Sequence, residues 1–262
     1  MEKCLNILAF FAHPDDETIL AGGTLALLAS SGNEIHYLIA TRGEGGETGE
    51  PPVCTIEELG EVREQELVCA VQALGGRSLT FLGYQDPRIG EGEELYAYTD
   101  NLVTLSGQVD ATIRQFNIDA VLTHGSDGEY GHPAHVLSYQ AARIAVEAYA
   151  KTGPDMPTPL LYTVQAIFND HPRPRLANKS DPAHLVLDVS AALPQKIKAA
   201  LCHRSQNALF VRRASEEAGR QLSVPEVIMP LESFHRAIPP TSAAPDDPLA
   251  DRLRLWERTQ VL

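Results

Sequence analysis

Hydrophobic and polar positions along the first 150 residues alternate between two patterns. Residues 5–12 are apolar at almost every position, which is typical of a strand buried on both faces of a parallel sheet. Residues 57–74 instead place Leu67, Val71 and Leu74 on one helical face, and two glycines follow as a stop signal. The same reasoning predicts further strands over 35–40, 79–82 and 119–124, and helices over 102–116 and 134–150. A polar turn after the first strand leads to Gly22-Gly23 and a helical stretch ending near residue 29.

This alternation predicts a fold class. Strands that alternate with helices favour a Rossmann-like α/β fold, in which a mostly parallel sheet carries helices on both faces. The second half is less regular, because five prolines fall between residues 154 and 174. We expect strands over 160–168 and 184–189, helices over 193–202 and 251–260, and an irregular stretch over 239–248. Neither an internal repeat nor a linker is evident, so residues 1–262 are expected to form a single domain.

The charge balance narrows the choice of partners. The chain has 21 Lys and Arg residues against 35 Asp and Glu residues, a formal net charge of −14. An acidic surface repels a phosphate backbone, so nucleic acid is excluded as a partner, and anionic lipid is disfavoured. No apolar run reaches the ~20 residues of a membrane-spanning helix, and the N-terminus does not resemble a signal peptide. The four cysteines have neither zinc-finger nor disulfide-framework spacing, so we expect a cytoplasmic protein with reduced thiols.

Candidate chemistry lies where two strands end. His13 and Asp16 follow the first strand, whereas His124, His132 and His135 follow the fourth. Ligands of open α/β sheets bind outside the carboxyl ends of the strands, so the two clusters can meet. Two imidazoles and one carboxylate suit zinc, and a catalytic zinc site keeps an open position for water.

Neighbouring residues complete a hydrolytic set. Asp15 would take a proton from the metal-bound water, and the remaining histidine would stabilise an oxyanion or protonate a leaving amine. Either cluster alone could instead be structural, because His-Pro-Asp-Asp also suits a helix N-terminus. The presence of both clusters at strand ends favours metal-assisted amide hydrolysis.

These motifs resemble those of a known family, the PIG-L/LmbE-like zinc N-deacetylases. Ala12-His13-Pro14-Asp15-Asp16-Glu17 with Gly22-Gly23 is similar to its AHPDDE…GG signature, and Gly131-His132-Pro133-Ala134-His135 is similar to its G-H-P-D-H motif. The whole match spans about residues 5–206. Its weaker pieces include Thr41-Arg42-Gly43-Glu44, Arg63-Glu64-Gln65-Glu66-Leu67, Leu82-Gly83-Tyr84-Gln85-Asp86 and His203-Arg204-Ser205-Gln206.

The resemblance implies a Rossmann-like N-deacetylase that removes an acetyl group from a GlcNAc-containing small molecule through a zinc-activated water. It implies that His13, Asp16 and His135 are the zinc ligands. Asp15 would be the general base, and His132 would assist at the tetrahedral intermediate. The resemblance also suggests four residues around the substrate: Arg63, Asp86, Glu44 and Tyr130. Relatives in this family suggest a homo-oligomer, a trimer or hexamer.

Two positions depart from the family pattern. Ala134 replaces the usual Asp of G-H-P-D-H, so the carboxylate that would orient His132 and raise its pKa is absent from this position. Asp127 or Glu129 are the available substitutes. Arg42 places a cation near the expected pocket mouth, where it would meet an anionic aglycone or remain solvated.

Two other functions stay open on sequence grounds. One is an amidase that removes another acyl group, from an aminosugar or a thiol conjugate. The other is a metal- or sugar-binding protein with little catalysis, suggested by Ala134. A phosphodiesterase is disfavoured, since a two-metal site needs more carboxylates than these motifs offer.

Overall fold

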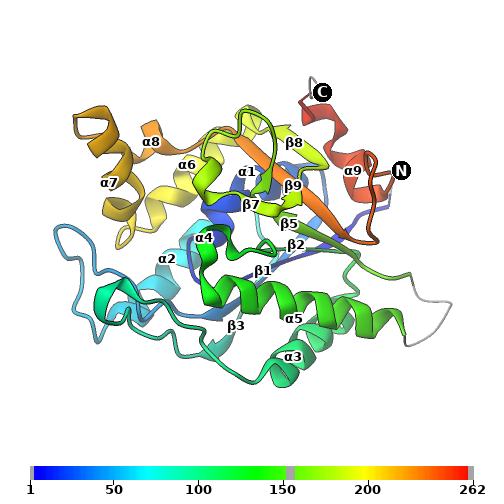
Figure 1. Ribbon diagram of the computed structural model, residues 1–262, viewed down its shortest axis with the longest axis horizontal. Helices are drawn as coiled ribbons and strands as arrows, with labels where there is room; N and C mark the ends of the chain where they lie inside the picture. Colours follow the sequence, from blue (N-terminus) through cyan, green and yellow to red (C-terminus); the bar gives the residue numbers. More distant parts are fainter. Residues whose placement is uncertain (1–2, 152–156, 259–262) are drawn as a thin grey trace.

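Seven strands form the central sheet, in the order β3-β2-β1-β4-β5-β9-β8 (Figure 1). The computed structural model describes residues 3–151 and 157–258. The strands are β1 (Asn6–Phe11), β2 (Glu34–Thr41), β3 (Ser78–Tyr84), β4 (Ala120–Thr123), β5 (Leu160–Val164), β6 (Ala166–Ile167), β7 (Asn178–Pro182), β8 (Leu185–Asp188) and β9 (Leu231–Ile238). The helices are α1 (Asp16–Ser30), α2 (Leu59–Ala73), α3 (Leu102–Phe116), α4 (Gly128–Gly131), α5 (Pro133–Ala150), α6 (Leu193–Cys202), α7 (Asn207–Ala218), α8 (Val224–Val227) and α9 (Pro248–Leu253).

The sheet topology confirms the predicted fold class. Strands β3, β2, β1, β4 and β5 pair in parallel, whereas β9 pairs antiparallel with both β5 and β8. From β1, the chain first adds β2 and β3 on one side and later adds β4 and β5 on the other. The reversal lies between β1 and β4, and such switch points are where open α/β sheets bind ligands.

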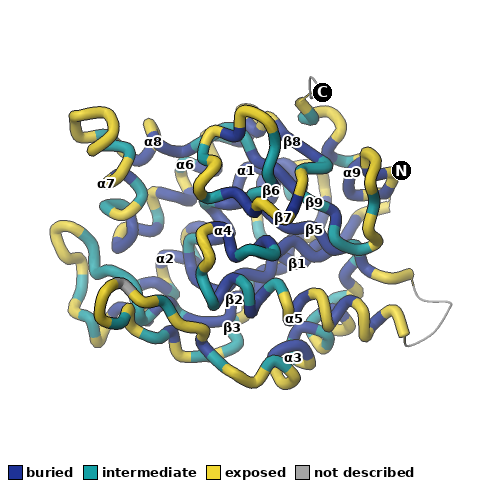
Figure 2. Tube along the Cα trace, in the orientation of Figure 1, coloured by how far each residue is buried: buried dark blue, intermediate teal, exposed yellow. Residues whose placement is uncertain are grey.

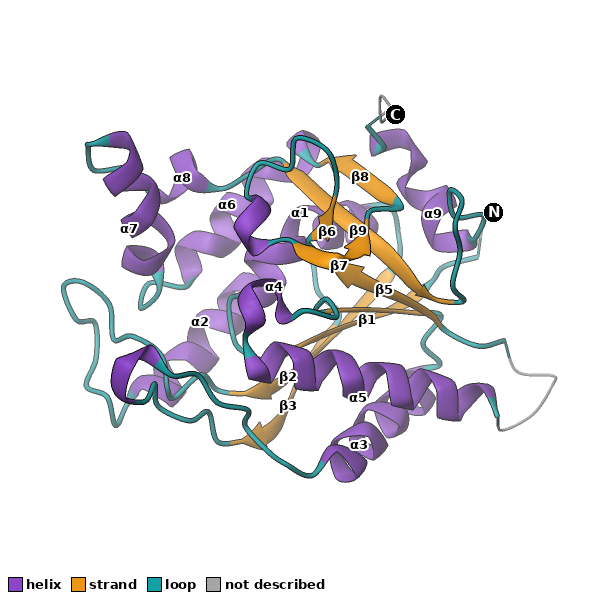
Figure 3. Cartoon of the chain, in the orientation of Figure 1, coloured by secondary structure: helices purple, strands orange, loops and turns teal. Residues whose placement is uncertain are grey.

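Helices cover both faces of the sheet (Figure 3). Ile7, Ala9 and Phe11 of β1 pack into a core that also contains buried residues of α1, α2, α6 and α9. Leu8 and Phe10 point to the opposite face, where α3 and α5 supply the second core. Strand β1 therefore runs buried through the centre of the molecule (Figure 2), which explains its continuous apolar run.

Several elements differ from the sequence predictions. The pattern analysis did not predict β7, β9, α7 or α8. The stretch predicted as one strand over 160–168 divides into β5 and β6 at Gln165, whose φ is 52°. The last helix begins at Pro248 rather than at residue 251, and the expected end at residue 260 lies outside the described residues.

Gly22 and Gly23 lie inside α1, which begins at Asp16 rather than after a polar turn. A Cβ atom on Gly23 would lie 2.3 Å from Val189 Cγ2, so only glycine lets the helix approach this closely. The Gly23 N–H donates to Glu232 Oε1 at 2.8 Å, and Lys196 Nζ donates to the same oxygen at 2.6 Å. This buried ion pair ties α1, α6 and β9 together.

The expectation of reduced thiols is wrong for one pair of cysteines. Cys69 of α2 and Cys202 of α6 form a disulfide across a sequence separation of 133 residues. The two helices pack against each other in the fold, which spacing along the chain could not reveal. Cys4 and Cys54 are free thiols.

Within residues 3–151 and 157–258, no helix combines the length and apolarity needed to cross a membrane.

Candidate metal and catalytic site

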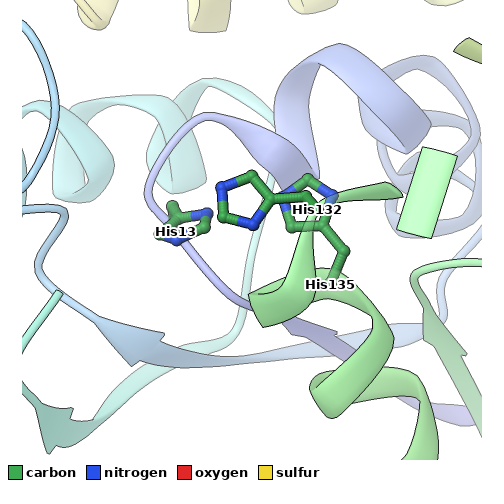
Figure 4. A group of neighbouring side chains, drawn as sticks. All are labelled: His13, His132 and His135. Atoms are coloured by element: carbon green, nitrogen blue, oxygen red, sulfur yellow. The ribbon is translucent and has the colours of Figure 1, made fainter. Parts of the chain in front are cut away.

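The two predicted clusters meet at the switch point between β1 and β4. His13 follows β1, whereas His132 caps the N-terminus of α5 and His135 lies in its first turn (Figure 4). Helix α5 follows β4 and the short helix α4 along the chain. The ring centroids of His13 and His132 are 5.0 Å apart, and those of His13 and His135 are 5.4 Å apart. Residues separated by more than one hundred positions therefore form one site.

Among the residues that the structure describes, two groups of side chains have the donor atoms and spacing to hold a metal ion. One group is His13, His132 and His135, and the other is Asp16, His124 and His135. Asp16 also links the groups, because its Oδ2 lies 3.2 Å from His13 Nδ1 and its Oδ1 lies 3.5 Å from His135 Nε2. Imidazole and carboxylate donors of this kind fit a divalent transition metal.

Glu129 orients the histidines of this cluster. Its Oε2 lies 2.6 Å from His135 Nδ1 and 3.1 Å from His124 Nδ1. Its other oxygen accepts from the Gly125 N–H at 2.9 Å. Burial would raise the pKa of Glu129, but the His124 charge and the hydrogen bonds to both histidines hold it well below its usual range. Carboxylates that bind the outer nitrogen of a ligating histidine fix its tautomer and leave Nε2 facing the metal.

His124 and His135 differ in what their Nε2 atoms do. The Ala12 N–H donates to His124 Nε2 at 3.0 Å, so the lone pair of that nitrogen is already used. Both His124 Nε2 and His135 Nε2 lie 3.5 Å from a carboxylate oxygen of Asp16, so the bond from the Ala12 N–H is what distinguishes them. The geometry thus favours His135 over His124 as a metal ligand.

His132 is not oriented by either substitute carboxylate that the sequence offered. Glu129 binds His124 and His135, and Asp127 Oδ2 accepts from the Ser180 N–H at 2.9 Å. Instead, His132 Nδ1 accepts from the backbone N–H of Ala134 at 3.2 Å. Neutral His132 therefore carries its proton on Nε2. Burial, together with His135 and His13, lowers the pKa of His132 to about 3.

Asp15 has an unusual backbone and a strongly placed carboxylate. Its φ is 106°, a region that non-glycine residues rarely adopt. Glu17 Oε2 accepts from the Asp15 N–H at 2.9 Å, and Arg63 Nη2 donates to Asp15 Oδ2 at 3.2 Å. Burial raises the pKa of Asp15 to about 7, although Arg63 opposes the shift. Such strain and such a pKa cluster at functional sites.

Arg63 is held by backbone oxygens as well as by Asp15. Its exposed fraction is only 4%, and it donates to the carbonyls of Pro14 and Gly43. A Cβ on Gly43 would lie 2.4 Å from Arg63 Nη1, so the glycine-rich loop is shaped around the guanidinium. Arg63 thereby positions Asp15 and this loop while it lines the cleft.

Of the other residues expected to contact the substrate, Asp86 lines the cleft, whereas Glu44 and Arg42 lie outside its lining. Asp86 Oδ1 lies 3.2 Å from His13 Nε2, and its Oδ2 accepts from the Gly45 N–H. Burial would raise the pKa of Asp86, but His13 outweighs it and lowers that pKa. Glu44 Oε2 accepts from the Asp86 N–H and its Oε1 from Arg42 Nε. Neither Glu44 nor Arg42 is among the residues that line the cleft.

The cleft above these groups has a volume of about 520 Å³. This volume lies within the range of small-molecule sites. Its inner residues are His13, Asp15, Asp16, Arg63, Asp86, His132 and His135. Tyr130 stands at its edge, with its ring 5.7 Å from the rings of both His132 and His135.

Pattern analysis overlooked a supporting network beneath Asp15. Glu17 Oε1 lies 3.1 Å from His203 Nε2, and Glu66 accepts from both the N–H and the hydroxyl of Ser205. The signal was available, since Glu17, Glu66, His203 and Ser205 all fall within the quoted motifs. The sequence did not show that these residues pair with each other across more than 130 positions.

Fold and site together define a class: a Rossmann-like protein with a histidine–carboxylate cluster, suited to a metal, at the switch point of its sheet. The chain belongs to the PIG-L family, described as "GlcNAc-PI de-N-acetylase", which it matches over residues 8–146.

Relatives support this family assignment. The chain is 31% identical over 238 residues to a 1D-myo-inositol 2-acetamido-2-deoxy-alpha-D-glucopyranoside deacetylase of Mycolicibacterium smegmatis, covering 77% of this chain and 80% of the relative. It is 36% identical over 166 residues to a Catenulispora acidiphila protein of the same description, deacetylase 3. That second match covers 57% of this chain, and only 46% of the relative.

Solved structures share the fold. GalB, the 4-carboxy-2-hydroxymuconate hydratase of Pseudomonas putida, aligns with a TM-score of 0.61 and 20% identity, covering 92% of this chain and all of the hydratase chain. The N,N'-diacetylchitobiose deacetylase of Pyrococcus horikoshii aligns with a TM-score of 0.57 and 20% identity, covering 88% and 83%. A hydratase and a deacetylase on one fold show that the site, not the fold, must carry the functional argument.

Proposed function

We propose that this protein is a zinc-dependent N-deacetylase that acts on a small GlcNAc-containing conjugate. The observation that carries the proposal is Asp15, a largely buried carboxylate (15% of its side chain is exposed) on strained backbone beside a histidine–carboxylate cluster. Relatives described as deacetylases of an acetamido-glucose linked to inositol support the substrate class.

His13, Asp16 and His135 would hold the metal ion. Their donors combine two imidazoles and one carboxylate, the mixture that zinc prefers at catalytic sites. His132 is less suited to bind the ion, because its Nε2 carries the proton when Nδ1 accepts from Ala134. A bound zinc ion would supply Lewis-acid chemistry at the amide carbonyl.

The chain's own residues would carry the proton transfers. Asp15 accepts a proton from the water that adds to the amide carbon, and its pKa of about 7 suits a base near neutral pH. His132 Nε2–H donates toward the carbonyl oxygen as negative charge develops there. When the C–N bond breaks, the proton taken up by Asp15 passes to the leaving amine. The products are acetate and a free aminosugar.

The test is acetate and amine release from GlcNAc conjugates by wild-type protein and Asp15→Asn. Loss of the base predicts a decrease in kcat of about 10²–10⁴-fold. Zinc content should be retained, since Asp15 is not a proposed ligand. The matched control is Asp110→Asn, which removes a partly exposed carboxylate on α3 that pairs with Arg114. Turnover by Asp15→Asn at the wild-type rate would remove Asp15 from the mechanism.

Zinc itself is tested separately. Chelator-treated protein should lose amine release and regain it when zinc is added. Full activity after the metal has been removed, verified by elemental analysis, would refute the metal assignment.

A further inference from the structure

The outer part of the catalytic cleft is apolar. Ile89, Leu95, Tyr96 and Leu209 line it, and we call these four residues the outer wall. The exposed fractions of Ile89, Tyr96 and Leu209 are 53%, 42% and 47%. They come from two distant segments, the loop after β3 and helix α7, and they converge on one cleft. Exposed apolar side chains gathered at one concave site mark a ligand surface more often than scattered ones do.

Polar groups near the outer wall already have partners. The Tyr96 hydroxyl donates to Glu94 at 2.7 Å, so the residue offers its ring rather than its oxygen. Gln206 Nε2 donates to the carbonyl of Glu47 and to Ser205 Oγ. Arg212 forms two hydrogen bonds of 2.7 Å with the Glu47 carboxylate, so these two opposite charges offset each other. A polyol aglycone would lose water here and find few donors in exchange.

The charges that line the cleft also disfavour an anionic aglycone. The cleft is lined by four carboxylates, those of Asp15, Asp16, Glu47 and Asp86, of which Asp15 pairs with Arg63 and Glu47 with Arg212. Arg42, the cation that the sequence placed at the pocket mouth, pairs with Glu44 outside the cleft lining. Arg63 is the one Lys or Arg among the described residues that line the cleft, and it already pairs with Asp15, so an anionic aglycone would find no unpaired Lys or Arg there.

We infer that the outer wall is an aglycone subsite for a neutral aromatic group attached to the aminosugar. This inference rests on the proposed deacetylase function and narrows its substrate class. The aminosugar would occupy the inner, polar part of the cleft. Its aromatic substituent would cover Ile89, Tyr96 and Leu209, and the Tyr96 ring offers an edge or face for ring packing.

The test compares three GlcNAc glycosides that share the acetyl group: phenyl, methyl and inositol-linked. Acetate release should give a kcat/KM for the phenyl glycoside that is about tenfold or more above the other two, in line with apolar discrimination in enzyme pockets. The double variant Ile89→Ser/Leu209→Ser should reduce the phenyl-to-methyl ratio to about threefold or less. Val103→Ser, which changes an 82%-exposed valine on α3, is the matched control and should leave the ratio unchanged.

The outcomes separate the two proposals. Turnover of all three glycosides with equal kcat/KM, or with a preference for the inositol conjugate, overturns the aromatic subsite alone. Absence of acetate release from every glycoside refutes the proposed function. In that event, calorimetric titration still decides the subsite: tighter binding of phenyl than of methyl glycoside supports it, and equal binding overturns it. Thermal unfolding of the double variant shows whether it is folded.

Discussion

Gly23→Ala tests how closely α1 must approach its neighbours. The added methyl group would lie 2.3 Å from Val189 Cγ2, 2.6 Å from Val189 Cβ and 3.1 Å from Glu232 Oε1. Val189 is fully buried, so it has no open space into which to move. The substitution must therefore either push α1 away from the sheet or displace Val189 and its neighbours.

Three effects determine how far Gly23→Ala lowers the free energy of unfolding. Overpacking of a buried site costs about 1–3 kcal/mol of unfolding free energy. Weakening the bond from the Gly23 N–H to the Glu232 carboxylate adds to the loss, and hydrogen bonds to charged groups contribute about 1.5–3 kcal/mol. Alanine regains about 1 kcal/mol through its higher helix propensity. We expect a net loss of about 2–4 kcal/mol.

Gly107→Ala is the matched control. Gly107 also lies inside a helix, α3, but a Cβ there would meet no atom within 4 Å. This exposed substitution should raise the unfolding free energy by about 0.5–1 kcal/mol, because only the propensity effect remains. Urea unfolding of the three proteins, compared at equal m-values, measures both changes. If Gly23→Ala were as stable as wild type, or gained stability as Gly107→Ala does, the close-approach argument would be wrong.

Three further predictions concern the metal cluster, the disulfide and a buried histidine. Glu129→Gln should weaken metal binding by about 10–100-fold, because His135 loses its carboxylate partner. Competition with a chromophoric chelator measures the metal affinity, and an unchanged affinity would contradict the orienting role of Glu129. Replacing both Cys69 and Cys202 with Ala should lower the unfolding free energy by about 2–5 kcal/mol and make unfolding insensitive to dithiothreitol. A wild-type protein that is equally insensitive would show that the disulfide does not form. Burial lowers the pKa of His36 below its ordinary value of 6.5. As the pH drops below 6.5, the histidine therefore binds a proton more readily in the unfolded chain than in the folded protein, and the free energy of unfolding of the wild type decreases. His36→Gln should show a shallower decline between about pH 7 and 5 in urea unfolding, whereas identical slopes would refute the assignment.

The sequence by itself determined the parallel sheet and the position of the site. The apolar run at β1 and the polar residues that follow β1 and β4 are local patterns, and strand ends of a parallel sheet share one edge. The tertiary structure alone decided which of those residues work together. Glu129 reaches His135 through a kink with φ of 60°, and Arg63 reaches Asp15 across 48 residues. Such contacts depend on how helices pack on the sheet, and hydrophobic periodicity records which face is buried but not what it is buried against.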